Sequence, residues 1–244
     1  MPKYRRGATD FDGVLLIDKP VGMTSHDVVD FVRSVTKEGR VGHTGTLDPG
    51  ASGLMVVCIG PATKLSAQLT DQKKQYLAEI AFGMSTSTDD AYGEALEITA
   101  PPAKIADAAY GKAVLEQFTG TLMQRPPQYS AIKQQGVKAY QKARMGLTVE
   151  LPPREVTVYQ IDLLSVSPTA WDISLEVSKG TYIRALARDI GVFVGCPAHL
   201  ANLRRTSIGD WRIEDALTLE QLLGYSDPVD LKTCLFDAKG GGNG

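Results

Sequence analysis

The stretch RVGHTGTLDPGASGLMVVCIG, residues 40–60, decides the fold because a glycine-rich loop runs directly into an apolar segment. Residues 54–59 carry no polar side chain, which predicts a strand buried on both faces. Pro49 fixes the backbone after Asp48. The loop's glycines permit positive φ and a close approach of backbone to a ligand, and they are Gly42, Gly45, Gly50 and Gly53. Asp48 is therefore either a reactive carboxylate held on a rigid element or an aspartate that caps its own turn.

The composition is that of an ordinary soluble protein with one large core, or one core and a small lobe. Of its 244 residues, 43% are hydrophobic and 22% are charged, and the net charge is −2. The charged start is followed by only four apolar residues, 14–17, so we expect no secretory or membrane segment and a cytoplasmic location. The three cysteines and three histidines show no metal spacing, which predicts no metal site and no disulfide framework.

Hydrophobic periodicity predicts a mixture of strands and helices along the chain. Residues 13–18, 75–83, 155–165 and 171–178 have strand patterns, whereas residues 26–38, 60–65, 103–119 and 183–190 have helical ones. Thr24 and Ser25 are the expected caps of the first helix, and Gly39 its end. Residues 84–93 are predicted to form a polar loop. Because strict strand–helix alternation is missing, we predict an α+β fold with a mixed, largely antiparallel sheet and flanking helices.

An acid-free basic segment occupies residues 117–149. It contains five basic side chains interleaved with two tyrosines, which are Arg125, Lys133, Lys138, Lys142 and Arg144 with Tyr129 and Tyr140. This asymmetry is typical of a contact with a phosphate backbone, but a solvated hairpin and helix would have the same composition.

Five parts of the sequence resemble one family. LIDKPVGMTSHDVV (16–29), GHTGTLDPGASG (42–53), PPQYSAIKQQGVKAYQKARMG (126–146), KGTYIRALARDIG (179–191) and HLANLRRTSIG (199–209) are similar to motifs of the TruB-type pseudouridine synthases. The resemblance implies an RNA isomerase that converts the uridine at position 55, in the T-loop of tRNA, to pseudouridine. It implies the pseudouridine synthase fold with a central RNA-binding cleft, and it makes Asp48 the catalytic carboxylate.

The same resemblance assigns expected roles to further residues. Arg184 is expected beside Asp48, Tyr182 against Asp48, Tyr76 stacked on the target uracil, and Leu203 in the uracil pocket. Expected RNA contacts or pocket-floor residues are Lys19, His43, Lys64, Asp90 and Lys133, with Arg204 and Arg205 as phosphate contacts. From residues alone, Tyr76 could equally be core, Lys19 a solvated turn lysine and His43 a loop histidine bonded to backbone.

The expected organisation is a catalytic domain over residues 1–224, with the basic insertion at about 121–150. Residues 225–244 are expected to form a short tail with no complete PUA-type domain. The partner is expected to be the T-arm of tRNA, with no membrane, no cofactor and no required protein partner, and the chain is expected to be a monomer.

Three other functions remain open at this point. A guide-dependent synthase acting on ribosomal RNA would share these motifs. A nucleoside or glycoside hydrolase would need a second carboxylate beside Asp48, with Asp89 or Asp90 as candidates. A non-catalytic RNA-folding module could share the fold and the basic segment, although Asp48, Tyr76 and Arg184 speak against it. The residues do not decide whether Asp48 would attack the base, attack C1′ or remove the C2′ proton.

Overall fold

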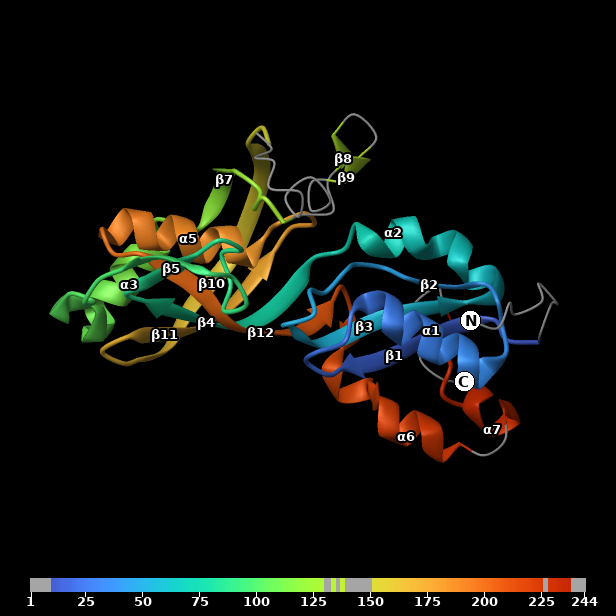
Figure 1. Ribbon diagram of the computed structural model, residues 1–244. Coiled ribbons are helices and arrows are strands. Elements are labelled where there is room, and N and C mark those ends of the chain that lie inside the picture. The colour runs from blue at the N-terminus through green and yellow to red at the C-terminus, as the bar shows by residue number, and fades with distance from the viewer. Residues whose placement is uncertain (1–9, 130–132, 135–136, 139–150, 226–227, 238–244) are drawn as a thin grey trace. The chain divides into compact units, whose positions relative to one another are not determined.

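The computed structural model describes residues 10–129, 133–134, 137–138, 151–225 and 228–237 (Figure 1). The chain divides into two compact units. Unit 1 comprises Met1–Gln75 and Arg204–Gly244, and unit 2 comprises Tyr76–Leu203. The chain thus leaves unit 1 once and returns to it.

Unit 1 is built around strand β3 (Ser52–Ile59). Antiparallel partners of β3 are β1 (Gly13–Lys19) and β2 (Val41–His43). The end of β12 (Ala198–Ile208) runs parallel to β3, and β14 (Leu217–Thr218) runs parallel to β1. The side chains of residues 54–59 are at most 1% exposed, so the predicted strand buried on both faces is confirmed.

Helix α1 (Ser25–Thr36) begins where its capping residues predict. The Asp27 amide donates to Thr24 Oγ1 over 3.1 Å, and the Thr24 amide donates to the Asp27 carboxylate over 2.8 Å. This reciprocal pair satisfies two amides that the first turn leaves free. The predicted end at Gly39 was wrong. The helix ends at Thr36, because Lys37 adopts a left-handed conformation with φ 57° and its amide donates to the Arg33 carbonyl.

The remaining elements of unit 1 are short. They are η1 (Gly60–Leu65), α2 (Ser66–Thr70), β13 (Trp211–Arg212), η3 (Ile213–Asp215), α6 (Leu219–Gly224) and α7 (Pro228–Lys232). The segment after α7 exchanges two backbone hydrogen bonds with β1, between Val14 and Phe236. The Phe236 ring also meets Trp211 edge-on, and Leu231 is fully buried. The predicted tail from residue 225 thus contains a helix and a segment that completes the core of unit 1.

Close packing of β3 against β12 depends on Gly53. Gly53 has φ 104°, and a Cβ added there would lie 2.3 Å from the carbonyl oxygen of Arg205. Gly45 also takes positive φ. Gly42 and Gly50 do not, so that part of the glycine prediction was wrong.

Unit 2 is a sheet in the order β12-β4-β11-β10-β7. Its further strands are β4 (Lys74–Phe82), β7 (Gly120–Gln124), β10 (Arg154–Val166) and β11 (Ala170–Val177). Strand β10 is antiparallel to both β11 and β7. The alternation predicted for β11 is confirmed, because Trp171, Ile173, Leu175 and Val177 are at most 2% exposed. The predicted α+β fold with a largely antiparallel sheet is therefore confirmed.

Two helices, α3 (Ala108–Glu116) and α5 (Ile183–Val194), accompany this sheet (Figure 1). The single helix predicted for residues 103–119 is broken at Asp107, whose carboxylate caps α3 after the short η2 (Ala103–Ala106). The break leaves the Ile105 carbonyl free to accept a 2.7 Å hydrogen bond from the indole of buried Trp171. The hydrogen bond from Trp171 to Ile105 thus competes with the bond that a continuous helix over residues 103–119 would make at this carbonyl.

Two small hairpins complete unit 2. Strands β5 (Met84–Thr86) and β6 (Ala95–Ile98) pair, so the predicted loop of residues 84–93 begins with a strand. Strands β8 (Lys133–Gln134) and β9 (Val137–Lys138) lie in the basic segment, with Lys133 opposite Lys138. Within the described ranges, no helix is long and apolar enough to cross a membrane.

Candidate active site

Asp48 lies half-buried in a tight turn of unit 1. The Ala51 amide donates to the Asp48 carbonyl over 3.0 Å, and the Gly22 amide donates to the Pro49 carbonyl over 2.8 Å. The turn is thereby fastened both to itself and to the loop after β1. This arrangement holds a carboxylate still while leaving it accessible.

Ser25 fixes the residue before Asp48. Its hydroxyl donates to the Leu47 carbonyl over 2.9 Å and accepts from the Leu47 amide over 2.8 Å. Both residues are buried. The first residue of α1 therefore anchors the loop that carries Asp48.

Lys19 is a buried cation in the field of Asp48. The side chain is fully buried, and its ammonium donates to the carbonyls of Pro20 over 2.8 Å and Met23 over 2.7 Å. Burial lowers the pKa of Lys19 to about 8, against the opposing effect of the Asp48 charge, while Arg205 lowers it further. The alternative of a solvated turn lysine is excluded by this burial, and the predicted place at the floor of the site stays a prediction.

The lowered pKa predicts a pH-dependent contribution of Lys19 to stability. The unfolded chain holds the Lys19 proton up to about pH 10.5, whereas the folded protein releases it near pH 8. Between these values the unfolded state binds more protons, so this contribution to stability rises with pH. We expect the unfolding free energy of wild type minus that of Lys19→Met to increase between pH 7.5 and pH 10 in urea titrations. With exposed Lys112→Met the same difference should stay constant, and a constant difference for Lys19 would contradict the assigned pKa.

Arg205 does not contact phosphate from the surface, so that prediction was wrong. It is 1% exposed, and its guanidinium donates to the carbonyls of Leu54 over 2.7 Å and Gly45 over 3.1 Å. Arg204 is more exposed and forms a bidentate pair with Asp18, at 2.7 and 3.1 Å. The buried Arg205 therefore ties the Asp48 loop to β3, and a phosphate role for Arg204 stays a prediction.

His43 and Lys64 complete the predicted residues of unit 1. His43 Nδ1 accepts from the Gly45 amide over 3.3 Å. Burial, followed by the charges of Arg205 and His26, lowers the pKa of His43, so its ring is neutral near pH 7. Lys64 is exposed on η1. Their contacts with RNA stay predictions.

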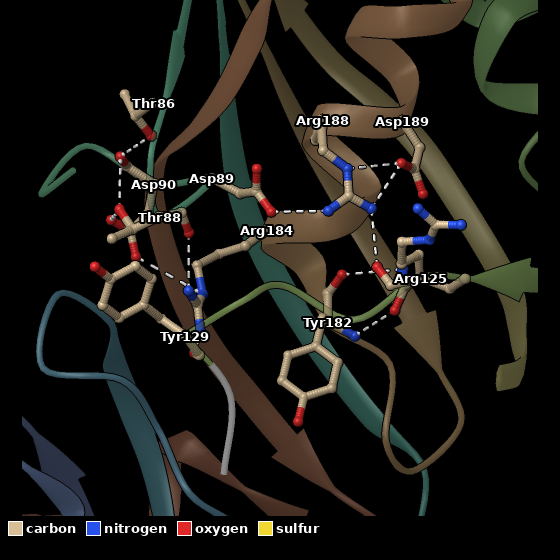
Figure 2. A network of polar contacts seen from close by, with 11 residues as sticks. Thr86, Thr88, Asp89, Asp90, Arg125, Tyr129, Tyr182, Arg184, Arg188 and Asp189 are labelled. Atoms are coloured by element: carbon tan, nitrogen blue, oxygen red, sulfur yellow. Dashed lines mark hydrogen bonds and ion pairs between the residues drawn. The ribbon is translucent and has the colours of Figure 1, made fainter. Parts of the chain in front are cut away.

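Arg184 is the centre of a polar network in unit 2 (Figure 2). Its side chain is only 6% exposed, and its guanidinium donates to the carbonyls of Thr88 over 2.8 Å and Tyr129 over 2.9 Å. It also lies 3.7 Å from the carboxylate of Asp90. Buried guanidinium groups need such partners because an uncompensated buried charge is costly. The predicted pairing of Arg184 with Asp48 stays a prediction.

Asp90 holds the loop between β5 and β6. Its carboxylate accepts from the Thr88 hydroxyl over 2.5 Å and from the Tyr92 amide over 3.0 Å. Its carbonyl accepts from the Thr86 hydroxyl over 2.6 Å. Asp90 therefore has a clear role in shaping the loop, and its contact with RNA stays a prediction.

Arg188 forms a second ion cluster one helical turn after Arg184 (Figure 2). Its guanidinium lies 2.9 Å from the carboxylates of Asp89 and Asp189, and it donates to the Arg125 carbonyl over 2.9 Å. Burial raises the pKa of both aspartates, and the Arg188 charge opposes the rise. Sequence reasoning missed Arg188, although its place four residues after Arg184 puts both on one helical face.

Tyr76, Tyr182 and Leu203 lie on three elements of unit 2. Tyr76 is on the buried face of β4, and Leu203 is half-buried on β12, the neighbouring strand. Tyr182 is the residue before α5, with a half-buried side chain. The side chain of Lys133 lies outside what the structure describes, as do Tyr140, Lys142 and Arg144. The roles of these residues toward RNA stay predictions.

Among the residues that the structure describes, no group of three or more His, Cys, Asp or Glu side chains could hold a metal ion. Unit 1 offers the turn-held carboxylate of Asp48, whose charge acts on the buried Lys19, and unit 2 offers the polar network around the buried Arg184.

The chain matches two family models and many curated proteins. Residues 33–183 match the N-terminal domain of the TruB family pseudouridylate synthases, and residues 184–235 match the tRNA pseudouridylate synthase B C-terminal domain. A tRNA pseudouridine synthase B from Bordetella pertussis is 45% identical, over 91% of this chain and 91% of that protein. Another from Caldanaerobacter subterraneus is 47% identical, over 86% of this chain and 74% of its own length.

Solved structures agree with these matches. A Cbf5-Nop10-Gar1 complex contains a chain that is 31% identical with a TM-score of 0.65, over 87% of this chain. An H/ACA RNP bound to a substrate RNA containing 2'-deoxyuridine contains one that is 29% identical with a TM-score of 0.64. This chain spans about half the length of those two chains, 54% and 53%. With both family models matched in order and relatives alike over most of their length, this chain belongs to the TruB family of pseudouridylate synthases.

Proposed function

We propose that this protein isomerises uridine to pseudouridine in tRNA, at position 55 of the T-loop, with Asp48 as the catalytic carboxylate. The observation that carries the proposal is the match of residues 33–235 to the two TruB family models. Within that match, Asp48 lies on a turn fastened at Ala51 and Gly22. A rigidly held carboxylate is what nucleophilic or general-base chemistry needs.

The reaction needs no external reactant. The N1–C1′ bond breaks, the base turns, a C5–C1′ bond forms, and the C5 proton is released while N1 gains one. No electrons leave the substrate, so we propose that no cofactor takes part. The target base must leave the stack to reach the carboxylate, because base-modifying enzymes act on extruded nucleotides. Tyr76 and Leu203 are the proposed pocket residues, and Arg184 is the proposed partner of Asp48.

The proposed partner is the T-arm of tRNA, bound by a monomer in the cytoplasm without a second protein. A guide-dependent synthase acting on ribosomal RNA is the second candidate. It is favoured by the solved structures, which are an H/ACA RNP and a Cbf5-Nop10-Gar1 complex. The curated relatives favour the tRNA enzyme, since they match over up to 92% of their own length. A hydrolase is disfavoured, because Asp89 and Asp90 form ion pairs with Arg188 and Arg184.

The direct test uses tRNA transcripts labelled with tritium at C5 of uridine. Isomerisation releases one tritium per target uridine, and reverse-transcription mapping of pseudouridine locates it. We expect release from a complete tRNA and from an isolated T-arm, and none when the target uridine is replaced by cytidine. Release only from ribosomal RNA with an added guide would support the second candidate. Free uracil as the product would identify a hydrolase, and no release from any tRNA would refute the proposal.

The basic segment gives a separate prediction about affinity. Each phosphate contact releases condensed counterions, so the logarithm of affinity falls with the logarithm of salt by about 0.7 to 0.9 per contact. Replacing Lys133, Lys138 and Lys142 by Ala should flatten this slope by about two units, with little effect on the rate at saturating enzyme. The matched control replaces Lys104, Lys112 and Lys179, exposed lysines outside the segment. An unchanged salt slope in the variant that lacks Lys133, Lys138 and Lys142 would mean that these lysines form a solvated surface and do not contact phosphate.

A further inference from the structure

We propose that Gln124 is a positioning residue that fixes the main chain of Tyr182 and, through it, the place of Arg184. The proposal rests on the proposed function for its catalytic consequence, but its structural consequence can be measured without RNA. Gln124 belongs to none of the motifs that point to the chemistry.

Gln124 makes a two-way hydrogen-bond pair with a single residue. It is the last residue of β7 and is 3% exposed. Its side-chain amide nitrogen donates to the Tyr182 carbonyl over 3.1 Å, and its side-chain oxygen accepts from the Tyr182 amide over 2.8 Å. The side chain therefore bonds Tyr182 as the backbone of a neighbouring strand would.

The start of α5 depends on this pair because it lacks a cap of its own. Tyr182 is the N-cap residue, and its side chain accepts no hydrogen bond from the first turn. Its carbonyl accepts from the Leu186 amide over 3.1 Å, which begins the helix. Amides and carbonyls buried at a helix end need partners, and Gln124 supplies both for Tyr182. Gln124 thus sets where α5 begins.

Arg184 lies two residues after Tyr182, the residue that Gln124 holds. Its carbonyl partners belong to Thr88 in the β5–β6 loop and Tyr129 in the segment after β7. One turn further along α5, Arg188 donates to the carbonyl of Arg125, the neighbour of Gln124 in sequence. Residues 124 and 125 therefore hold α5 at two points separated by about 9 Å of helix axis. Arg184 lies between these two points (Figure 2).

Only an amide side chain suits this position. The backbone of Tyr182 offers one N–H and one carbonyl, and a glutamine amide can meet both because it carries a donor group and an acceptor group. A glutamate of the same shape would keep the bond from the Tyr182 amide but, when ionised, would face the carbonyl without a proton. A leucine would remove both of these bonds, so the Tyr182 amide would lose this acceptor and the Tyr182 carbonyl would keep the bond from the Leu186 amide. The two substitutions therefore form a graded series.

We expect Gln124→Leu to lower the single-turnover rate of pseudouridine formation by about 10- to 100-fold, as displaced catalytic groups do. The Kd for tRNA should stay within about threefold, because phosphate contacts are untouched. Gln124→Glu should lie between Leu and wild type, and should recover toward wild type as pH falls and the carboxyl regains a proton. The control is Gln160→Leu, an exposed glutamine of β10 that bonds Asp162.

The RNA-free measurement is amide hydrogen exchange over residues 182–188. We expect at least about tenfold faster exchange in Gln124→Leu and unchanged exchange in Gln160→Leu. A folded Gln124→Leu protein with wild-type rate and wild-type exchange would overturn the proposal. If that variant does not fold, the shape-matched Gln124→Glu decides by the same two readouts. If wild type forms no pseudouridine, the proposed function fails, and exchange at 182–188 alone decides the role of Gln124.

Discussion

Replacement of Asp48 by Asn is expected to lower the single-turnover rate of pseudouridine formation by at least about 10³-fold. The substitution removes the reacting charge and almost no volume, and the turn bonds at Ala51 and Gly22 involve backbone atoms only. Affinity for tRNA should therefore stay within about threefold of wild type, since protein contacts with the phosphate backbone of the RNA supply most of the binding.

Tritium release at saturating enzyme measures this loss, and thermal unfolding checks that the variant is folded. The matched control is Asp210→Asn, an exposed aspartate in a turn of the same unit. A rate within tenfold of wild type would remove Asp48 from the chemistry, and a loss of affinity equal to the loss of rate would make it a binding residue.

The second large effect concerns stability. Gly53→Ala should lower the free energy of unfolding by about 3–6 kcal/mol, from the strain of positive φ and from overpacking together. The added Cβ would lie 2.3 Å from the backbone oxygen and 2.7 Å from the backbone nitrogen of Arg205. These atoms belong to the paired strand β12, so the main chain of the sheet would have to shift. A loss of this size is a large part of the stability of an ordinary domain.

Gly22 provides the control for this prediction. Its φ of 92° is similar, but an added Cβ would meet no atom within 4 Å. Gly22→Ala should therefore show the strain alone, about 1–3 kcal/mol. Urea unfolding of both variants separates backbone strain from overpacking. Equal losses of unfolding free energy would mean that the contact of the added Cβ with the Arg205 backbone is not destabilising.

The sequence predicts those elements whose signals are local. Strand β3 follows from an uninterrupted apolar run, and the start of α1 follows from the cap predicted at Thr24. The break at Asp107 could not be predicted, because the Ile105 carbonyl is claimed by an indole 66 residues away. Arg205 was mistaken for a phosphate contact for the same reason, since its carbonyl partners are 151 and 160 residues away in the sequence.

The candidate site divides in the same way. Asp48 and Arg184 stand in recognisable motifs, and their elements could be placed by periodicity. Gln124 carries no local signal, because its partner Tyr182 is 58 residues away and any polar residue could end a strand. Only the pairing of two distant segments shows that both its amide nitrogen and its amide oxygen bond the backbone of Tyr182.

The division of unit 1 between the two ends of the chain has a consequence for synthesis. On the ribosome, all of unit 2 emerges before Arg204, while β1 and β3 still lack β12, β14 and the segment around Phe236. At about 5–20 residues per second, residues 204–244 take about 2–8 s to be made. During that interval the apolar strands of unit 1 have no finished core, and this nascent intermediate is where we expect chaperones to bind and aggregation to start.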